Sequence, residues 1–215
     1  VDFASPVLKG PSDYGFDYSF GTAGSAEMNP STFIENNRAT IIPTLSSQQA
    51  RENNGQWYGR DDNIAAQGYT MDALVPALSR KACEFVEKAT RIRPDQPFFL
   101  YYATWLVHAP WQIRCESLLN KYVKKLGVEL TEEARTNWKV EGQNNPFYCA
   151  MVELLDYYVG RLVNHLETTD DPRWPGHKLI ENTYVIFTSD NGGMEGGPNE
   201  IATDNYPLDK GKISL

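Results

Sequence analysis

Two short apolar runs, each preceded by a stretch with helical periodicity, constrain the fold of this chain most strongly. They are residues 98–103 and residues 183–188. Both runs are apolar at successive positions, which is typical of strands that helices cover on the two faces of a parallel sheet. The order helix, strand, helix, strand therefore predicts an α/β fold.

The helical stretches carry apolar residues at steps of three and four. This spacing predicts one helix over residues 71–89 and a second over residues 146–166. The polar segment 111–143 lies between them, and we expect a surface insertion or a crossover there. The first 60 residues are rich in Gly, Pro, Asn and Ser, which favours loops and short strands, with a small hairpin about residues 36–37.

Composition excludes several function classes. Of the 215 residues, 41% are hydrophobic and 22% are charged, so the chain has enough apolar material for a folded core. The formal net charge of −8 argues against a nucleic-acid partner, because phosphate backbones require clustered Lys and Arg. No apolar run approaches the roughly 20 residues of a membrane-spanning helix. The cysteines lack metal-ligand or redox spacing, and we expect Cys83 and Cys149 to be buried thiols in helices.

Polar residues follow both predicted strands. His108 comes shortly after the first strand, and Asp190 and Asn191 come just beyond the second. In open α/β sheets, ligands bind in the crevice beyond the carboxyl ends of the strands. If both runs belong to one parallel sheet, we expect these three side chains to face the same edge.

Asp190 and Asn191 offer two oxygen ligands side by side, one charged and one neutral. Hard cations such as Ca²⁺ and Mg²⁺ prefer such ligands. Gly192 and Gly193 allow the backbone to turn tightly beneath the pair. Asp-Asn-Gly-Gly is also an ordinary turn after a strand, and the residues alone leave both interpretations open.

Three further side chains have both a chemical and a structural interpretation. His108 is either a hydrogen-bonded structural residue or a group that contacts a substrate oxygen or protonates a leaving group. It lies between two tryptophans, Trp105 and Trp111. Lys210 and Lys212 are either solvated surface lysines or the source of a cation that neutralises an anionic substrate.

Four stretches of the chain together resemble the sulfatases of the alkaline-phosphatase-like superfamily. In chain order they are residues 13–21, with Gly-Phe-Asp; residues 97–102, leading to His108-Ala109-Pro110; residues 151–166; and residues 182–193, with Asp-Asn-Gly-Gly. The resemblance implies an alkaline-phosphatase-like α/β fold, in which a mixed sheet is flanked by helices and is incomplete at both ends. Residues 1–215 would then be an internal portion of a single sulfatase catalytic domain.

The resemblance also implies a function. The protein would be a sulfuric ester hydrolase, arylsulfatase-like or a glycan sulfatase, and its partner would be a small-molecule or glycan sulfate ester. Its cofactor would be Ca²⁺ or Mg²⁺, and a formylglycine made from Cys or Ser would attack sulfur. Asp190 and Asn191 would be metal ligands, His108 would contact the sulfate or the leaving group, and Lys212 would be the lysine of the sulfate pocket.

The chain departs from the family pattern in two places. Asp209, Lys210 and Ile213 stand where Arg, Gly and Gly are usual, which leaves Lys210 as the alternative pocket lysine. The modification motif, Cys or Ser followed two residues later by Pro or Ala and then Ser-Arg, is absent. We therefore expect the nucleophile segment to lie before Val1 and a C-terminal part to be absent as well. The piece alone is predicted to be inactive.

Two alternatives to a sulfatase remain open at this stage. One is a phosphodiester or phosphonate monoester hydrolase of the same superfamily, which shares the metal pair and the pocket. The other is a noncatalytic α/β binding protein in which Asp190 and Asn191 form only a turn. The family resemblance is compatible with a periplasmic, secreted or lysosomal compartment.

Overall fold

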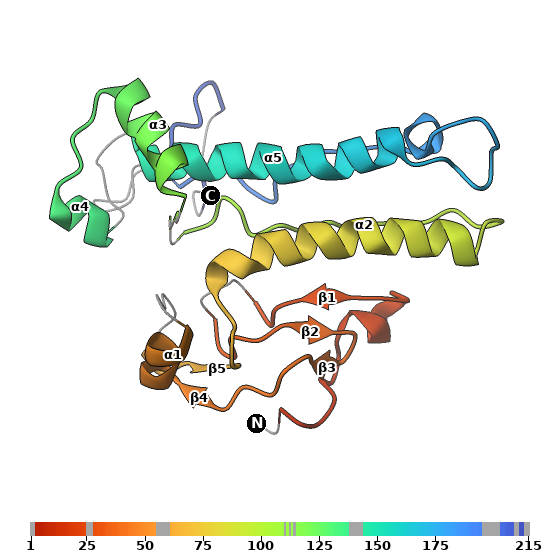
Figure 1. Ribbon diagram of the computed structural model, residues 1–215, viewed down its shortest axis with the longest axis horizontal. Helices are drawn as coiled ribbons and strands as arrows, with labels where there is room; N and C mark the ends of the chain where they lie inside the picture. Colours follow the sequence, from red (N-terminus) through yellow and green to blue (C-terminus); the bar gives the residue numbers. More distant parts are fainter. Residues whose placement is uncertain are drawn as a thin grey trace. The chain divides into compact units, whose positions relative to one another are not determined.

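The structure is a computed structural model, and it divides into two compact units. It describes residues 3–24, 28–54, 61–109, 111, 113, 115–137, 144–194, 203–208 and 211–212. The first unit is Val1–Trp105 and the second is Leu106–Leu215. Each unit is described here by itself (Figure 1).

The first unit combines two small antiparallel sheets with helices. One sheet has the order β1-β2-β3, and in the other β4 pairs with β5. The elements in chain order are η1 (Pro11–Tyr14), β1 (Phe20–Gly21), β2 (Ile34–Glu35), β3 (Arg38–Ala39), β4 (Leu45–Ser46), α1 (Ser47–Asn54), β5 (Ile64–Ala65), η2 (Met71–Ala73) and α2 (Leu74–Ile92).

The predicted hairpin about residues 36–37 is confirmed. It joins β2 to β3, and Asn36 has a positive φ of 54°. Asn tolerates the left-handed region better than most residues, because its short polar side chain can hydrogen-bond locally. Here the Asn36 backbone N–H donates to the Ser19 carbonyl oxygen over 2.7 Å, which ties the turn to the residues before β1.

The helix predicted over residues 71–89 is also confirmed, and it extends to Ile92. Its first turn is the 3₁₀ segment η2, which continues into α2. One face of α2 is buried, with the residues Leu74, Val75, Ser79, Ala82, Val86 and Thr90. The helix ends ahead of Pro94, since a residue that precedes proline disfavours the α conformation.

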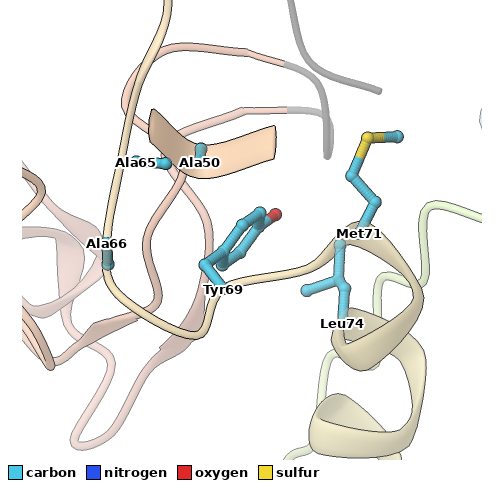
Figure 2. Close-up of a cluster of buried hydrophobic side chains, with 6 residues drawn as sticks. All are labelled: Ala50, Ala65, Ala66, Tyr69, Met71 and Leu74. Carbon is cyan, nitrogen blue, oxygen red and sulfur yellow. The ribbon is translucent and has the colours of Figure 1, made fainter. Parts of the chain in front are cut away.

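The core of the first unit lies where α1, β5 and the start of α2 meet. It combines three alanines with three larger side chains, and its members are Ala50, Ala65, Ala66, Tyr69, Met71 and Leu74 (Figure 2). Trp105 packs against this cluster together with Phe33, Leu45 and Leu78. The alanines allow the helix and the strand to approach closely.

A polar cluster ties the β1–β2 sheet to α2. Glu35 Oε1 accepts hydrogen bonds from the Tyr18 hydroxyl and from Lys81 Nζ, each over 2.6 Å. The hydrogen bonds from Lys81 and Tyr18 lower the pKa of Glu35 below its ordinary value of 4.5. Burial and the Glu35 contact raise the pKa of Tyr18 to about 12, so its hydroxyl stays protonated and donates.

The regular elements described in the second unit are helices. Its elements are α3 (Glu116–Leu126), α4 (Glu132–Asn137), α5 (Pro146–Thr168) and η3 (Leu179–Asn182). The segment that we expected to be a polar insertion thus contains α3 and α4. Helix α3 packs against the first turns of α5 around a buried core of Ile113, Leu119, Phe147 and Ala150.

Helix α5 confirms the prediction over residues 146–166. Pro146 occupies its first turn, where the missing N–H costs nothing. The Asn145 side-chain oxygen accepts from the backbone N–H groups of Phe147 and Tyr148 over 2.9 and 3.0 Å, so it caps two of the free donors at this end. Cys149 lies in α5 and Cys83 in α2 as expected, but both thiols are half-buried rather than buried.

A buried ion pair lies in the turn that follows α5. Asp171 is 1% exposed, and its carboxylate accepts hydrogen bonds from Arg173 Nε and Nη2 over 2.7 and 2.8 Å. These bonds hold the pKa of the Asp171 carboxyl below its ordinary value. The arrangement fixes the turn that leads from α5 to η3.

The two predicted strands are not strands in the described structure, which corrects our expectation. Residues 98–103 and 183–188 have no regular secondary structure, and Tyr184 is 99% exposed and Ile186 85% exposed. A strand requires a neighbour for its backbone hydrogen bonds, and the described sheets contain neither segment. Helices with small antiparallel sheets are consistent with the expected α/β class, but the described residues form no parallel sheet.

Candidate functional site

The Asp190-Asn191 pair lies in a bend that directly follows residues 183–188. Both side chains are exposed. The bend has a local hydrogen bond, because the Ser189 hydroxyl donates to the Asn191 carbonyl oxygen over 2.7 Å. Both residues are thus exposed, and a longer-range hydrogen bond of this backbone forms at Gly193.

Gly193 is the point at which the rest of the site attaches. Its backbone N–H donates to Asn205 Oδ1 over 2.9 Å, and its carbonyl oxygen accepts from Asn205 Nδ2 over 3.0 Å. The same carbonyl oxygen accepts from the Lys212 backbone N–H over 2.9 Å. One residue of the Asp-Asn-Gly-Gly segment is thus bonded to two later parts of the chain.

Only glycine fits at position 193. A Cβ there would lie 2.8 Å from the Cβ of Thr203 and would also overlap the Thr203 hydroxyl. That hydroxyl donates to the Met194 carbonyl oxygen over 2.7 Å. The missing side chain lets residues 203–205 approach the backbone closely, which is a more specific reason for the glycine than a tight turn.

Lys212 lies beside the segment that carries the acid–amide pair. The hydrogen bond to Gly193 fixes its backbone, and its side chain is half-buried. The sequence singled out both Lys212 and the Asp-Asn-Gly-Gly segment, and the structure brings their backbones together. Lys210, the alternative, lies outside the described residues, as do Asp209, Ile213 and Pro110.

His108 stands in a different setting. Its imidazole is exposed, and Nδ1 lies 2.5 Å from the Ala109 carbonyl oxygen. A carbonyl oxygen only accepts, so Nδ1 carries the proton in this contact. Within the described part of the chain, no hydrogen bond or ion pair joins His108 to Asp190, Asn191 or Lys212.

The tryptophans on either side of His108 in the sequence each pack on a hydrophobic core. Trp105 packs on the core of the first unit. Trp111 packs on the α3–α5 core and meets the Tyr148 ring edge-on, with 5.9 Å between the ring centroids. Both tryptophans thus have a structural role in a core.

The pair supplies the right kind of metal ligand in too small a number. Ca²⁺ takes six to eight oxygen ligands, whereas Asp190 and Asn191 provide two side chains. Among the residues that the structure describes, no group of three or more His, Cys, Asp or Glu could hold a metal ion. Asp190 and Asn191 therefore have the chemistry of two calcium ligands, and by themselves they are too few for a calcium site.

Sequence reasoning missed Asn205 and Thr203. Both lie in the polar stretch before the Pro207 turn, where Asn and Thr are common because their side chains bond nearby backbone. Nothing in this composition predicts a bond to a glycine that lies in another part of the chain. The glycine at position 193 is consistent with a close approach of another segment. A tight turn would explain the same glycine equally well, so the sequence does not predict the contact.

Comparison with known proteins gives a consistent family match. A family model described as Sulfatase matches residues 10–213. A protein named "Sulfatase" from Formosa agariphila is 36% identical over 121 residues, which are 55% of this chain and 18% of that protein. The human N-acetylglucosamine-6-sulfatase is 23% identical over 190 residues, 76% of this chain and 31% of that protein.

A third relative is matched over most of this chain. The uncharacterized sulfatase YdeN of Escherichia coli is 25% identical over 190 residues, which cover 87% of this chain and 24% of that protein. The chain thus spans less than a third of the length of each of these relatives. None of the helices in the described ranges has the length and apolar character needed to cross a membrane.

Proposed function

The chain belongs to the sulfatase family, and from this we propose that the complete protein hydrolyses sulfate monoesters. The family match over residues 10–213 carries the proposal, because it includes all four residues that we assign to the site. The contact between Lys212 and Gly193 supports it, since a pocket for sulfate needs a cation close to the metal ligands.

Residues 1–215 would be an internal portion of a single catalytic domain. In the complete domain, residues 98–103 and 183–188 would be strands of a mixed sheet flanked by helices. Their composition supports this, because Tyr184, Ile186 and Phe187 are large apolar side chains that stand 71% or more exposed in the described structure. Full burial of such a side chain stabilises a folded protein by about 1.5–3 kcal/mol, so covering residues 183–188 would stabilise the complete domain.

Asp190 and Asn191 would hold the metal ion. Their carboxylate and amide oxygens suit Ca²⁺, with Mg²⁺ as the smaller alternative. The bound ion would supply positive charge for the sulfate oxygens, and a formylglycine outside these 215 residues would supply the nucleophile. We propose no other role for the metal ion or the formylglycine.

Lys212 and His108 would act on the substrate directly. The Lys212 ammonium would offset the charge of the sulfate group and stabilise the charge that builds up as the ester S–O bond breaks. With Nδ1 bonded to Ala109, Nε2 of a protonated His108 would donate to a sulfate oxygen or pass a proton to the departing alcohol. Overall, one water is consumed, and an alcohol and sulfate are released.

The test is a comparison of substrates on the complete protein. We expect it to hydrolyse an aryl sulfate or a sulfated sugar with a higher kcat/KM than a phosphate diester or a phosphonate monoester. Asp190→Ala should abolish this activity and weaken Ca²⁺ binding, whereas Asp170→Ala, an exposed aspartate near the end of α5, should leave both unchanged. Higher efficiency on the phosphate diester would overturn the proposal in favour of the related hydrolase.

A further inference from the structure

We propose that Asn205 is a positioning residue for the metal pair, and that it acts by clamping the backbone of Gly193. The inference rests on the proposed function, because it concerns the same site. It adds a residue to which no sequence pattern assigns a role. Asn205 would touch neither substrate nor metal, and its effect would pass through the glycine.

The carboxamide of Asn205 satisfies both backbone groups of Gly193. Oδ1 accepts from the Gly193 N–H and Nδ2 donates to the Gly193 carbonyl oxygen, over 2.9 and 3.0 Å. A primary amide presents a donor and an acceptor side by side, so it can pair with one residue much as a neighbouring strand does. Aspartate has no donor and alanine has neither group, so neither of them can replace it.

The clamp acts on a stretch of backbone that contains two successive glycines, Gly192 and Gly193. Gly192 and Gly193 have the widest conformational freedom of any residue type. On the side of the metal pair, the Ser189 hydroxyl donates a hydrogen bond to the Asn191 carbonyl oxygen. Two hydrogen bonds to one residue favour a single conformation of such a segment.

Asn205 also joins the two halves of the proposed pocket. The Gly193 carbonyl oxygen that accepts from Asn205 Nδ2 is the one that accepts from the Lys212 N–H. A carbonyl oxygen has two lone pairs, and here both have partners. Orienting this carbonyl group would therefore hold the Lys212 backbone beside the segment that carries Asp190 and Asn191.

Thr203 gives the clamp its second contact. Its hydroxyl donates to the Met194 carbonyl oxygen, and its side chain occupies the space that a Cβ at Gly193 would need. Residues 203–205 thus contact two successive residues after the metal pair. The Thr203 contacts would hold the backbone of residues 203–205 in place. The Asn205 amide would then select the orientation of the Gly193 backbone.

The experiment uses the complete protein and two measurements. Calcium titration of Asn205→Ala and Asn205→Asp should give a Ca²⁺ affinity about 10-fold below that of the wild type, as for other residues that orient metal ligands. Hydrogen–deuterium exchange without calcium should be faster in the peptides that contain Gly193 and Lys212. Tyr206→Phe, at an 86% exposed neighbour, is the matched control and should alter neither measurement.

Asp190→Ala separates failure of this inference from failure of the proposed function. If Asp190→Ala leaves calcium binding intact, the metal assignment itself is wrong. If Asp190→Ala abolishes binding while both Asn205 variants bind calcium like the wild type, the clamp alone is refuted. Should Asn205→Ala fail to fold, Asn205→Asp still decides, because it keeps the acceptor for the Gly193 N–H and replaces the donor to the Gly193 carbonyl oxygen with a second carboxylate oxygen.

Discussion

The backbone N–H of Lys212 donates a hydrogen bond to the carbonyl oxygen of Gly193 over 2.9 Å. This bond places a lysine beside the segment that carries an acid–amide pair, although the two are separated along the chain by residues 194–211. A lysine held in this way has a fixed starting point for its side chain. It loses less conformational freedom when it binds an anion than a lysine on a free loop would.

The first prediction concerns the Lys212 ammonium. We expect Lys212→Ala to lower kcat/KM of the complete protein for a sulfate ester by about 100-fold, because a cation that stabilises transition-state charge is removed. Lys212→Arg keeps the charge and should recover part of the loss. Lys88→Ala, at an exposed position on α2, is the control and should have wild-type kinetics. Wild-type kinetics in Lys212→Ala would transfer the role to Lys210.

The second prediction concerns His108 as a proton donor. His108→Gln should lower kcat by about 100-fold or more on an alkyl sulfate, whose leaving alcohol needs a proton. The loss should be much smaller on a nitrophenyl sulfate, because that leaving group departs as an anion. An equal loss on both substrates would indicate a contact with the sulfate group instead of proton transfer.

A matched control for His108 is available in the same unit. His177 stacks on Trp174 with 3.6 Å between the ring centroids, and its Nδ1 lies 2.8 Å from Glu181 Oε2. These contacts place it in a turn after α5, away from any assigned role. We expect His177→Gln to change neither kcat nor its dependence on the leaving group.

The third prediction is about stability. Asp171→Ala should destabilise the protein by about 2–3 kcal/mol, because it leaves the Arg173 guanidinium, only 12% exposed, without its bidentate partner. Asp170→Ala is the adjacent control. The Asp170 side chain is 85% exposed and pairs with Lys178 on the surface, so its loss should cost less than about 1 kcal/mol. Thermal or denaturant unfolding of the two variants compares them, and equal losses would contradict the prediction.

The fourth prediction follows from the lowered pKa of Glu35. The hydrogen bonds from Lys81 and Tyr18 favour its ionised form in the folded state, so the folded pKa lies below the unfolded one. The resulting stabilisation is present above the unfolded pKa and is lost as pH falls through the folded pKa.

Acid titration of two variants checks this sign. Glu35→Gln should be less stable than the wild type at neutral pH, and the difference should shrink as pH falls below 4.5, the ordinary value for the group. Glu84→Gln, on the exposed side of α2, is the control and should follow the wild-type pH profile more closely. A stability difference for Glu35→Gln that stays constant into acid would show that the carboxylate charge contributes nothing.

Local patterns predicted the helices and the hairpin because their causes are local. Helix α5 follows from apolar spacing, with Asn145 and Pro146 marking its start. The turn at Asn36 follows from the tolerance of that residue for a positive φ. The backbone hydrogen bonds within helix α5 and those between β2 and β3 join residues only a few positions apart. The sequence of each segment therefore contains most of the information that determines its structure.

The site and the proposed sheet depend on contacts between residues that are far apart in the chain. The sequence therefore predicted them less completely than it predicted the helices and the hairpin. The sequence singled out Asp190 and Lys212, yet the bond between the Gly193 and Lys212 backbones required the structure. Asn205 had no signal of its own, because its partner lies in a separate segment. The runs 98–103 and 183–188 have strand composition, but a strand forms only when a neighbour supplies hydrogen bonds.

The last prediction tests whether residues 183–188 form a covered strand in the complete protein. Ile186 is 85% exposed in the described structure, and on this exposure alone Ile186→Lys would be nearly neutral. If helices cover the strand on both faces, as we propose, the same change buries an unpaired charge and should cost about 3 kcal/mol or more. Ile92→Lys, at a 63% exposed site at the end of α2, is the control and should cost little. Unfolding temperatures and soluble yields of the two variants decide the matter. Equal, small effects would mean that the segment remains uncovered and that the proposed mixed sheet does not include it.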